Sequence, residues 1–135
     1  MKKILVLLIL AIGLTGLSFT VKNFQDKKPW IVPDSFKKMK NPVANDAASI
    51  AEGKTLWNTH CKSCHGAKGL GDGSKAAQLK TEPGNFTDPD TQALSDGALF
   101  YKTSEGRDDM PSFKKKMPEA EDRWNLVNFI RTLKK

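Results

Sequence analysis

The first strong helical pattern in the chain runs from residue 46 to residue 66. Residues three or four positions apart share one helical face there, and these are Ile50, Gly53, Trp57 and His60. Asp46 is suited to cap the start of this helix, because its carboxylate can accept backbone N–H groups. Glycine inside a helix costs about 1 kcal/mol relative to alanine, and one compensating use of Gly53 is to let a second helix approach closely.

The second strong pattern occupies the C-terminal end of the chain, from Pro118 to Lys135. Proline suits the first turn of a helix. Acidic residues near the start and basic residues near the end suit the helix dipole. One apolar stripe is predicted to face the core, formed by Trp124, Val127 and Ile130 with Leu126 and Leu133 alongside.

Between these helices the pattern is mostly irregular. Residues 66 to 90 are rich in glycine, proline, aspartate and asparagine, which predicts a long loop with one helical turn at residues 74 to 79. A loop of this length in a small domain is usually functional or packed against something large. Residues 96 to 104 predict a short helix that Ser95 or Asp96 caps. No strand pattern is visible in the sequence, so the expected fold class is all-α.

The N-terminal segment predicts on which side of the membrane the protein is located. Lys2 and Lys3 precede residues 4 to 21, which carry no charge. Residues 1 to 21 therefore indicate either a cleaved export signal or a retained membrane anchor. Both alternatives send the rest of the chain across the membrane, to the periplasmic side.

Residues 22 to 45 are expected to form a basic tether that contains three prolines. Residues 46 to 135 are expected to form the folded domain. The apolar residues Trp30, Ile31 and Val32 interrupt the tether, and they either dock on the domain or meet a partner.

The net charge of +7 is unevenly distributed. Residues 1 to 45 carry 8 basic and 2 acidic side chains, whereas residues 46 to 135 carry 14 basic and 13 acidic ones. A nucleic-acid-binding domain carries its positive charge on the folded body. The charge pattern therefore argues against a nucleic-acid partner.

The residues with ligand chemistry are concentrated in THCKSCHG, residues 59 to 66, which contains both cysteines and both histidines of the chain. Adjacent side chains on a helix point about 100° apart, so these four neighbours are poorly arranged for a tetrahedral zinc site. A redox dithiol is disfavoured as well, because the βαβ pattern of thioredoxin-like proteins is not visible.

The spacing Cys61-x-x-Cys64-His65 is the attachment motif of a c-type haem. Two thiols separated by two residues can form thioether bonds to the two porphyrin vinyl groups, and His65 is then held as the proximal iron ligand. Attachment takes place outside the cytoplasm, in agreement with the N-terminal segment. We therefore predict one covalent haem c per chain, with no required role for His60.

The remaining candidates for the sixth iron ligand are Met39, Met110, Met117 and His60. Met39 lies in the expected tether, and His60 would have to reach the opposite haem face. Met117 abuts the last helix and can make an apolar contact at its start. Met110 ends a loop that can wrap across the far face. We predict Met110, with Met117 as the alternative, and a Met/His pair raises the reduction potential.

These features together resemble the class I, single-haem cytochromes c over residues 48 to 135. The matching motifs, in order, are GKTLWNTHCKSCHG, LKTEPGNF, GALFYKTSEG, MPSF and EDRWNLVNFIRTL. The resemblance implies about three to five short helices wrapped around one haem. It also implies that the first and last helices cross, with Gly53 and Trp57 against Trp124 and Val127.

The resemblance further implies a set of site residues. Cys61 and Cys64 would hold the haem, and His65 and Met110 would ligate the iron. Pro83 would accept a hydrogen bond from the second ring nitrogen of His65, which fixes the imidazole.

The expected function is electron transfer rather than catalysis. With both axial positions filled, the iron would exchange single electrons with a redox donor and a redox acceptor. Lys114, Lys115 and Lys116 either rim the haem edge and attract an acidic partner or form a solvated loop. Two alternatives are a membrane-anchored cytochrome subunit of a redox complex and a haem enzyme with an open sixth site.

Overall fold

The computed structural model describes residues 29 to 135, and Ile31–Lys135 form one compact unit. The predicted export signal or anchor at residues 1 to 21 lies outside the described residues, as do residues 22 to 28 of the predicted tether. Within residues 29 to 135 no helix has the length and apolar character needed to cross a membrane.

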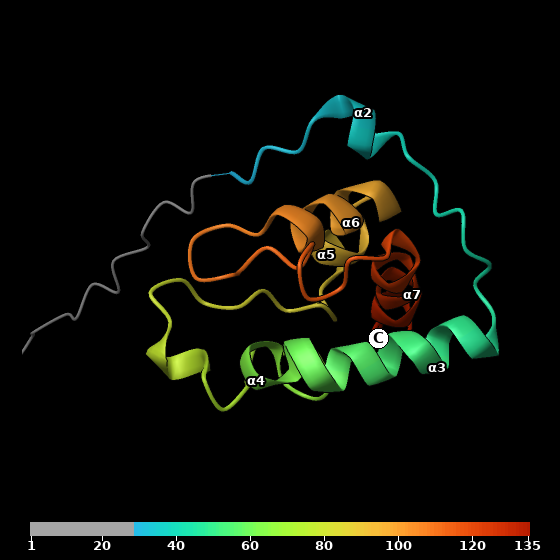
Figure 1. Ribbon diagram of the computed structural model, residues 1–135. Coiled ribbons are helices and arrows are strands. Elements are labelled where there is room, and N and C mark those ends of the chain that lie inside the picture. The colour runs from blue at the N-terminus through green and yellow to red at the C-terminus, as the bar shows by residue number, and fades with distance from the viewer. Residues whose placement is uncertain (1–28) are drawn as a thin grey trace, which may run out of the picture. The chain divides into compact units, whose positions relative to one another are not determined.

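Helices make up the regular structure of the described residues, so the predicted all-α class is confirmed (Figure 1). A single pair of bridged residues, Arg107 and Met110, is the exception to the helical pattern there. The helices are α2 (Asp34–Lys37), α3 (Ala47–Leu56), a π-helix (Trp57–Cys61), α4 (Lys62–His65), a 3₁₀ turn (Ala76–Gln78), α5 (Pro89–Gln92), α6 (Asp96–Glu105) and α7 (Ala120–Arg131).

The first predicted helix is present, but it is not uniform. Asp46 caps α3 as expected, with its carboxylate accepting the N–H of Ser49 at 2.9 Å. After Leu56 the helix widens into the π-helix before it returns to α geometry in α4. A π-turn inserts one residue into the helical repeat and is frequent at functional sites. Here it immediately precedes the Cys-x-x-Cys-His motif.

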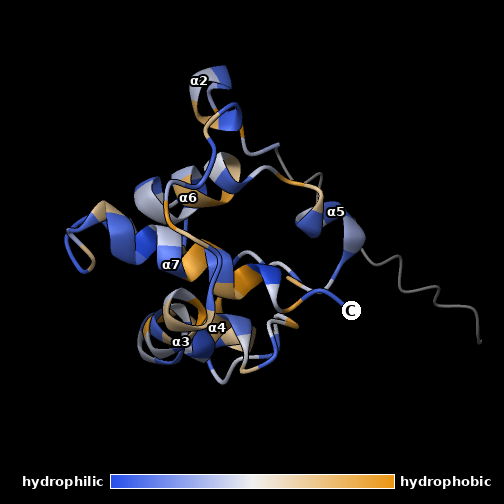
Figure 2. Cartoon of the chain, turned by 90° about the vertical axis from the view of Figure 1, so that its right-hand side faces the viewer, coloured by the Kyte–Doolittle hydropathy of each residue, from blue (hydrophilic) through white to orange (hydrophobic). Residues whose placement is uncertain are grey.

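Helices α3 and α7 cross in close contact, as the resemblance implies. A Cβ atom at Gly53 would overlap the carbonyl oxygen of Asn125 in α7, so only glycine allows the two backbones to come this close. Figure 2 shows α7 between α3 and α6, with hydrophobic positions along its length. The buried core contains the predicted stripe Trp124, Val127 and Ile130 together with Trp57, Leu99, Phe100, Phe113, Met117, Leu126 and Phe129.

The last helix begins later than predicted. Its first residue is Ala120 and Glu119 is the N-cap, so Pro118 precedes the helix rather than forming its first turn. The predicted short helix is confirmed as α6, with Ser95 as its cap: the Ala98 N–H donates to the Ser95 hydroxyl at 3.2 Å. The predicted helical turn in the long loop is the 3₁₀ turn Ala76–Gln78.

Residues 31 to 45, hereafter the strap, differ from the predicted tether because they belong to the compact unit. Val32 is 5% exposed, which supports docking on the domain, whereas its neighbour Ile31 is 82% exposed. The Asn41 side chain donates to the Trp124 carbonyl at 3.1 Å and to the side-chain oxygen of Asn128 at 2.8 Å. The strap is therefore fastened to α7 by specific hydrogen bonds.

Candidate functional site

The three motif residues lie where the π-helix joins α4. Cys61 ends the π-helix, and Cys64 and His65 belong to α4. Neither thiol is in a disulfide; Cys61 is buried and Cys64 is half-buried. Burial raises the pKa of Cys61 to about 12, with a smaller contribution from the neighbouring Cys64, so this thiol is protonated at neutral pH. Both sulfur atoms are available for covalent attachment.

The loop that follows α4 folds back and caps it. The N–H groups of Gly71, Gly73 and Lys75 donate to the carbonyls of His65, Cys64 and Ser63 at 2.9, 3.1 and 2.8 Å. The last carbonyls of a helix have no partner within the helix, so this loop satisfies three of them. Gly66 has a φ of 81°, in the region that favours glycine, and it turns the chain into the loop.

The imidazole of His65 lies against aromatic rings. Its centroid is 5.0 Å from that of Phe86 and 5.8 Å from that of Trp57. Burial lowers the pKa of His65, and the backbone of Gly84 opposes this shift only in part. The neutral imidazole is therefore favoured, which is the form that ligates a metal.

One ring nitrogen of His65, Nδ1, is buried and has no hydrogen-bond partner among the described residues. Buried polar atoms of this kind call for an explanation. The backbone near this ring is that of Gly84, which follows Pro83, the residue predicted to accept a hydrogen bond from His65. The Pro83 carbonyl also lies close to Gly71, where an added Cβ atom would be 2.6 Å from it. The His65–Pro83 hydrogen bond stays a prediction.

Phe86 belongs to the site, although the sequence did not predict a role for it. Its N–H donates to the Gly69 carbonyl at 2.6 Å, and its carbonyl accepts from the Gln92 side chain at 2.6 Å. Gln92 also donates to the Ile130 carbonyl in α7 at 3.0 Å. These contacts hold the Phe86 ring against His65. The signal in the sequence was the single aromatic residue of the loop motif LKTEPGNF.

Met110 lies at the base of a tight turn between α6 and α7. The N–H of Arg107 donates to the Met110 carbonyl at 2.8 Å, and the Met110 N–H donates to the Arg107 carbonyl at 2.9 Å. Asp108, inside this turn, has a φ of 52°. The Met110 side chain is half-buried and packs against the core.

The other candidates for a sixth ligand lie in different surroundings. Met117 is 1% exposed and belongs to the buried core cluster, consistent with an apolar contact at the start of the last helix. Met39 lies in the strap and is 40% exposed. His60 is half-buried, with its ring centroid 6.0 Å from that of Phe113.

The segment that contains Met117 is held by Arg123, which is almost fully buried. The guanidinium donates to the Met117 and Pro118 carbonyls and, at 3.0 Å, to the Ser104 hydroxyl. The Ser112 hydroxyl donates to the Ser104 carbonyl at 2.6 Å. Arg123 and Ser104 therefore fasten the chain on the C-terminal side of Met110 to α6 and α7.

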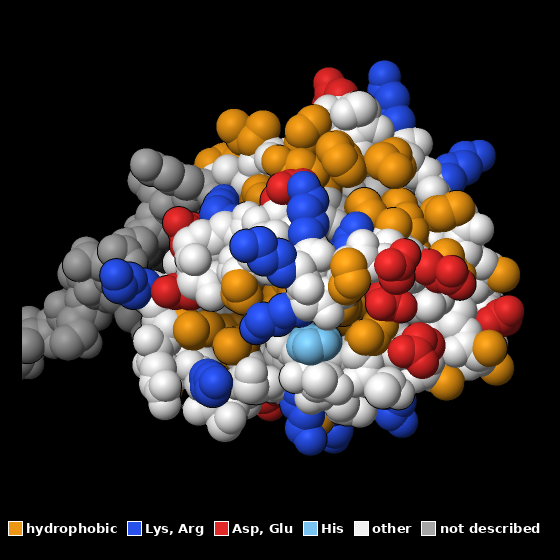
Figure 3. Space-filling model, in the orientation of Figure 1, with side chains coloured by type: hydrophobic (Ala, Val, Ile, Leu, Met, Phe, Trp, Pro, Cys, Tyr) orange, Lys and Arg blue, Asp and Glu red, His pale blue; other side chains and the backbone are white. Residues whose placement is uncertain are grey.

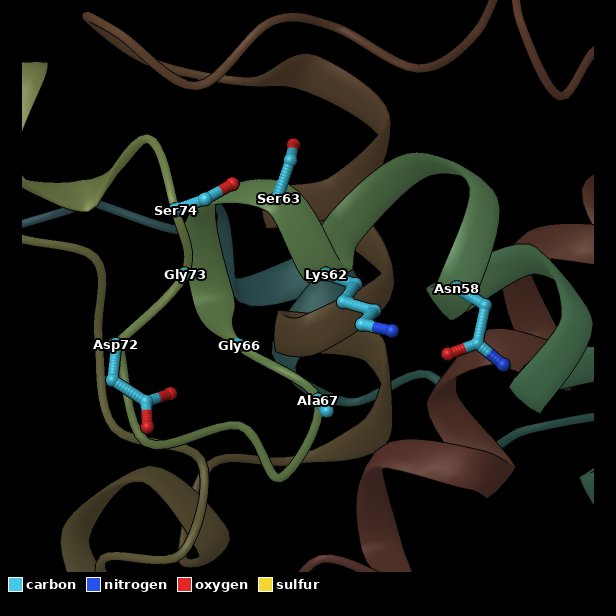
Figure 4. A pocket seen from close by; sticks show the side chains of 8 residues that line it. All are labelled: Asn58, Lys62, Ser63, Gly66, Ala67, Asp72, Gly73 and Ser74. Atoms are coloured by element: carbon cyan, nitrogen blue, oxygen red, sulfur yellow. The ribbon is translucent and has the colours of Figure 1, made fainter.

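A polar hollow on the surface lies beside the motif, but it is distinct from the three motif residues (Figure 4). It contains the two residues between the cysteines and part of the capping loop, namely Asn58, Lys62, Ser63, Gly66, Ala67, Asp72, Gly73 and Ser74. A porphyrin requires a largely apolar surface, so we do not place a haem in this hollow.

The donor set fits a c-type haem better than a bare metal ion. Among residues 29 to 135, no group of three or more His, Cys, Asp or Glu side chains is arranged to hold a metal ion. Two free thiols and a neutral imidazole that follows the second thiol directly match what thioether attachment and proximal ligation need.

Comparison with known proteins identifies the family. Residues 48–130 match the family model described as cytochrome C oxidase, cbb3-type, subunit III. A solved structure named KustC0563 c-type cytochrome is 33% identical, with a TM-score of 0.54, and the match covers 62% of this chain and 98% of that one. The chain belongs to the class I c-type cytochromes. This family carries covalently bound haem c and transfers electrons.

A second solved structure places a similar domain in a larger assembly. It is the Kuenenia stuttgartiensis reducing HAO-like protein complex Kustc0457/Kustc0458, with 26% identity and a TM-score of 0.63. The match covers 70% of this cytochrome and 47% of that chain, so the cytochrome spans about half of the longer protein. A search among curated proteins gave no significant match.

Proposed function

We propose that this cytochrome shuttles single electrons between redox proteins outside the cytoplasm, with one covalently attached haem c. The observation that carries the proposal is the Cys61-x-x-Cys64-His65 motif, whose thiols are free and whose half-buried imidazole favours the neutral form. The chain contains only two cysteines, so it can form two thioether bonds to a single haem. When bound, the haem supplies a one-electron Fe(II)/Fe(III) couple.

In this proposal His65 and Met110 are the axial ligands. The neighbouring rings of Phe86 and Trp57 both contact the imidazole, and the unpartnered Nδ1 is free to donate to the loop backbone at Pro83 or Gly84. Such a hydrogen bond fixes the ring and makes the ligating nitrogen more basic. Met110 is favoured over Met117 because it is only half-buried and lies in an exposed turn, whereas Met117 fills the core.

Optical spectroscopy of the purified holoprotein tests this ligand set. We expect the weak charge-transfer band of methionine-ligated ferric haem in the wild type and in Met117→Ala, and its loss in Met110→Ala. A band that persists in Met110→Ala would refute Met110 as the ligand. A high-spin ferric spectrum in the wild type would instead favour a haem enzyme with an open sixth site.

A fixed subunit of a membrane redox complex is the second candidate. It is supported by the family model, whose description names an oxidase subunit, and by the similar domain in a multi-protein complex. Sequencing the N-terminus of the mature protein distinguishes the two. A start near Phe19 indicates a released carrier, whereas an intact N-terminus indicates an anchored subunit.

Partner recognition through Lys114, Lys115 and Lys116 is part of the proposal. Lys114 forms an ion pair with Glu105, so part of the positive charge is compensated, and Lys116 lies over the Phe113 ring at 5.8 Å. Residues 31 to 135 carry 17 basic and 14 acidic side chains, and Figure 3 shows both signs on one face. Attraction of an acidic partner would therefore be local and would weaken as salt rises.

A further inference from the structure

The carboxylate of Asp109 joins two loops that are far apart in the sequence. Its Oδ2 atom accepts the backbone N–H of Lys80 at 2.7 Å and that of Thr81 at 3.2 Å, across 29 and 28 residues. Asp109 belongs to the tight turn that ends at Met110. Lys80 and Thr81 belong to the long loop that continues to Gly84, beside the His65 ring.

The turn around Asp109 is stiff enough to transmit this contact to Met110. Arg107 and Met110 exchange two backbone hydrogen bonds across it, at 2.8 and 2.9 Å. Gly106 begins the turn with a φ of 69°, and a Cβ atom there would overlap the Met110 carbonyl. Since Asp109 precedes Met110 directly within this closed turn, a movement of one residue displaces the other.

The chain that follows Met110 is fastened to helix α6. Ser112 donates to the Ser104 carbonyl, and Phe113 donates its N–H to the Thr103 carbonyl at 3.3 Å, both on α6. On the N-terminal side of Met110, the Asp109 carboxylate holds the turn to the loop that contains Lys80 and Thr81. A carboxylate that accepts two backbone N–H groups forms stronger hydrogen bonds than a neutral acceptor does.

We propose that Asp109 is a positioning residue that latches the Met110 turn to the loop beside His65. The latch keeps Met110 in place and limits how often the sixth coordination position opens to an outside ligand. This inference rests on the proposed function, because it takes Met110 as an axial ligand.

The test uses the holoprotein and two matched variants, Asp109→Asn and Asp108→Asn. Both variants remove one negative charge from the same turn. The Asp108 carboxylate contacts Arg107 at 3.3 Å, whereas the Asp109 carboxylate contacts the loop that contains Lys80 and Thr81. Asparagine also tolerates the positive φ of residue 108. Imidazole, which is mostly neutral at pH 8, serves as the incoming ligand, so that the change in charge has little effect on its approach.

Two readouts separate the latch from the ligand assignment. Amide hydrogen exchange reports on Lys80 and Thr81 directly, and stopped-flow absorption reports the rate at which imidazole binds the ferric protein. We expect both to be about fivefold to tenfold faster in Asp109→Asn, because the two backbone hydrogen bonds lose their charged acceptor and become weaker. Asp108→Asn should match the wild type in both.

Each other outcome overturns a specific statement. Unchanged exchange at Lys80 and Thr81 in Asp109→Asn would show that the carboxylate does not hold the loop. Faster exchange with an unchanged imidazole rate would show that the contact does not control the sixth position. If Met110→Ala keeps the methionine band, the proposed ligand set fails, and the role of Asp109 at the iron fails with it.

Discussion

At Gly53 the backbones of α3 and α7 are so close that a methyl group has no room. A Cβ atom there would overlap the Asn125 carbonyl and lie 2.8 Å from Cβ of Phe129. The neighbouring atoms are backbone and the root of a side chain, so they cannot move away without separating the helices. Close packing of this kind makes a single added atom costly.

We therefore expect Gly53→Ala to destabilise the holoprotein by about 2 kcal/mol or more, in spite of the higher helix propensity of alanine. Urea unfolding followed by far-UV circular dichroism measures this. Gly84→Ala is the control, because a Cβ atom at Gly84 meets nothing within 4 Å. Equal stability of both variants would show that the helices separate at little cost.

Met117 is a second position where one side chain supports the fold. It is 1% exposed in the core cluster. Met117→Ala should lower the free energy of unfolding by about 2–5 kcal/mol, because it removes buried apolar volume and leaves a cavity. Met39→Ala should cost less in packing, because Met39 is 40% exposed, and it leaves the proposed iron ligands in place. Denaturation of both variants in their haem-bound form checks the order, and the reverse order would contradict the core role of Met117.

At the scale of elements, the strap is held to the helix crossing by two asparagines. Asn41 donates to Trp124 and to Asn128, and the Asn128 side chain donates to the Ala44 carbonyl at 3.0 Å and to the Ser49 hydroxyl at 2.6 Å. Strap, α3 and α7 thus share one hydrogen-bonded network, and partly buried networks of this kind fix the arrangement of elements.

Asn41→Ala is expected to cost about 1–2 kcal/mol, because the side-chain oxygen of the buried Asn128 loses its donor. It should also make residues 31 to 45 more sensitive to limited proteolysis, which mass spectrometry of the fragments detects. Asn45→Ala, at an exposed position of the same strap, should behave as the wild type. Equal cleavage of both variants would indicate that the apolar contacts alone hold the strap.

At the scale of the whole molecule, the folded unit consists of short helices connected by long loops. The loop from residue 66 to residue 88 packs against α4 and the His65 ring, so much of its support comes from the proposed haem site. Burial of a large apolar surface on folding stabilises the folded state. Covalent attachment of a large apolar cofactor should therefore contribute substantially to the stability of the domain.

Replacing both Cys61 and Cys64 by alanine tests this expectation. The variant should lose its haem on extraction with acidified acetone, and its thermal unfolding should begin at a clearly lower temperature. Ser63→Ala, between the two cysteines, keeps both thioether bonds and serves as the control. A double variant with unchanged thermal stability would mean that the polypeptide alone supplies the core.

Local features of the fold could be predicted because their causes are local. The Asp46 and Ser95 caps and the apolar stripe of α7 follow from residues within a few positions of one another. The start of α7 was predicted two residues too early. Pro118 is compatible with a first turn, but the buried Arg123 holds the Pro118 carbonyl and the helix begins after Glu119.

Features that depend on distant contacts could not be predicted in this way. The strap looked like a tether, because its fastening residue Asn41 has its partners 83 and 87 positions away. The π-helix, the contact of Phe86 with His65 and the link from Asp109 to Lys80 likewise depend on packing between segments that no sequence period connects.

The sequence by itself determined the all-α class, the haem-attachment motif and the family, because attachment chemistry demands residue types at fixed spacing and helices demand a fixed period. Only the tertiary structure decided how His65 is surrounded, which residues belong to the folded unit and what holds the Met110 turn. These depend on which carbonyls and rings meet across the fold, since buried polar groups must find partners wherever the chain brings them.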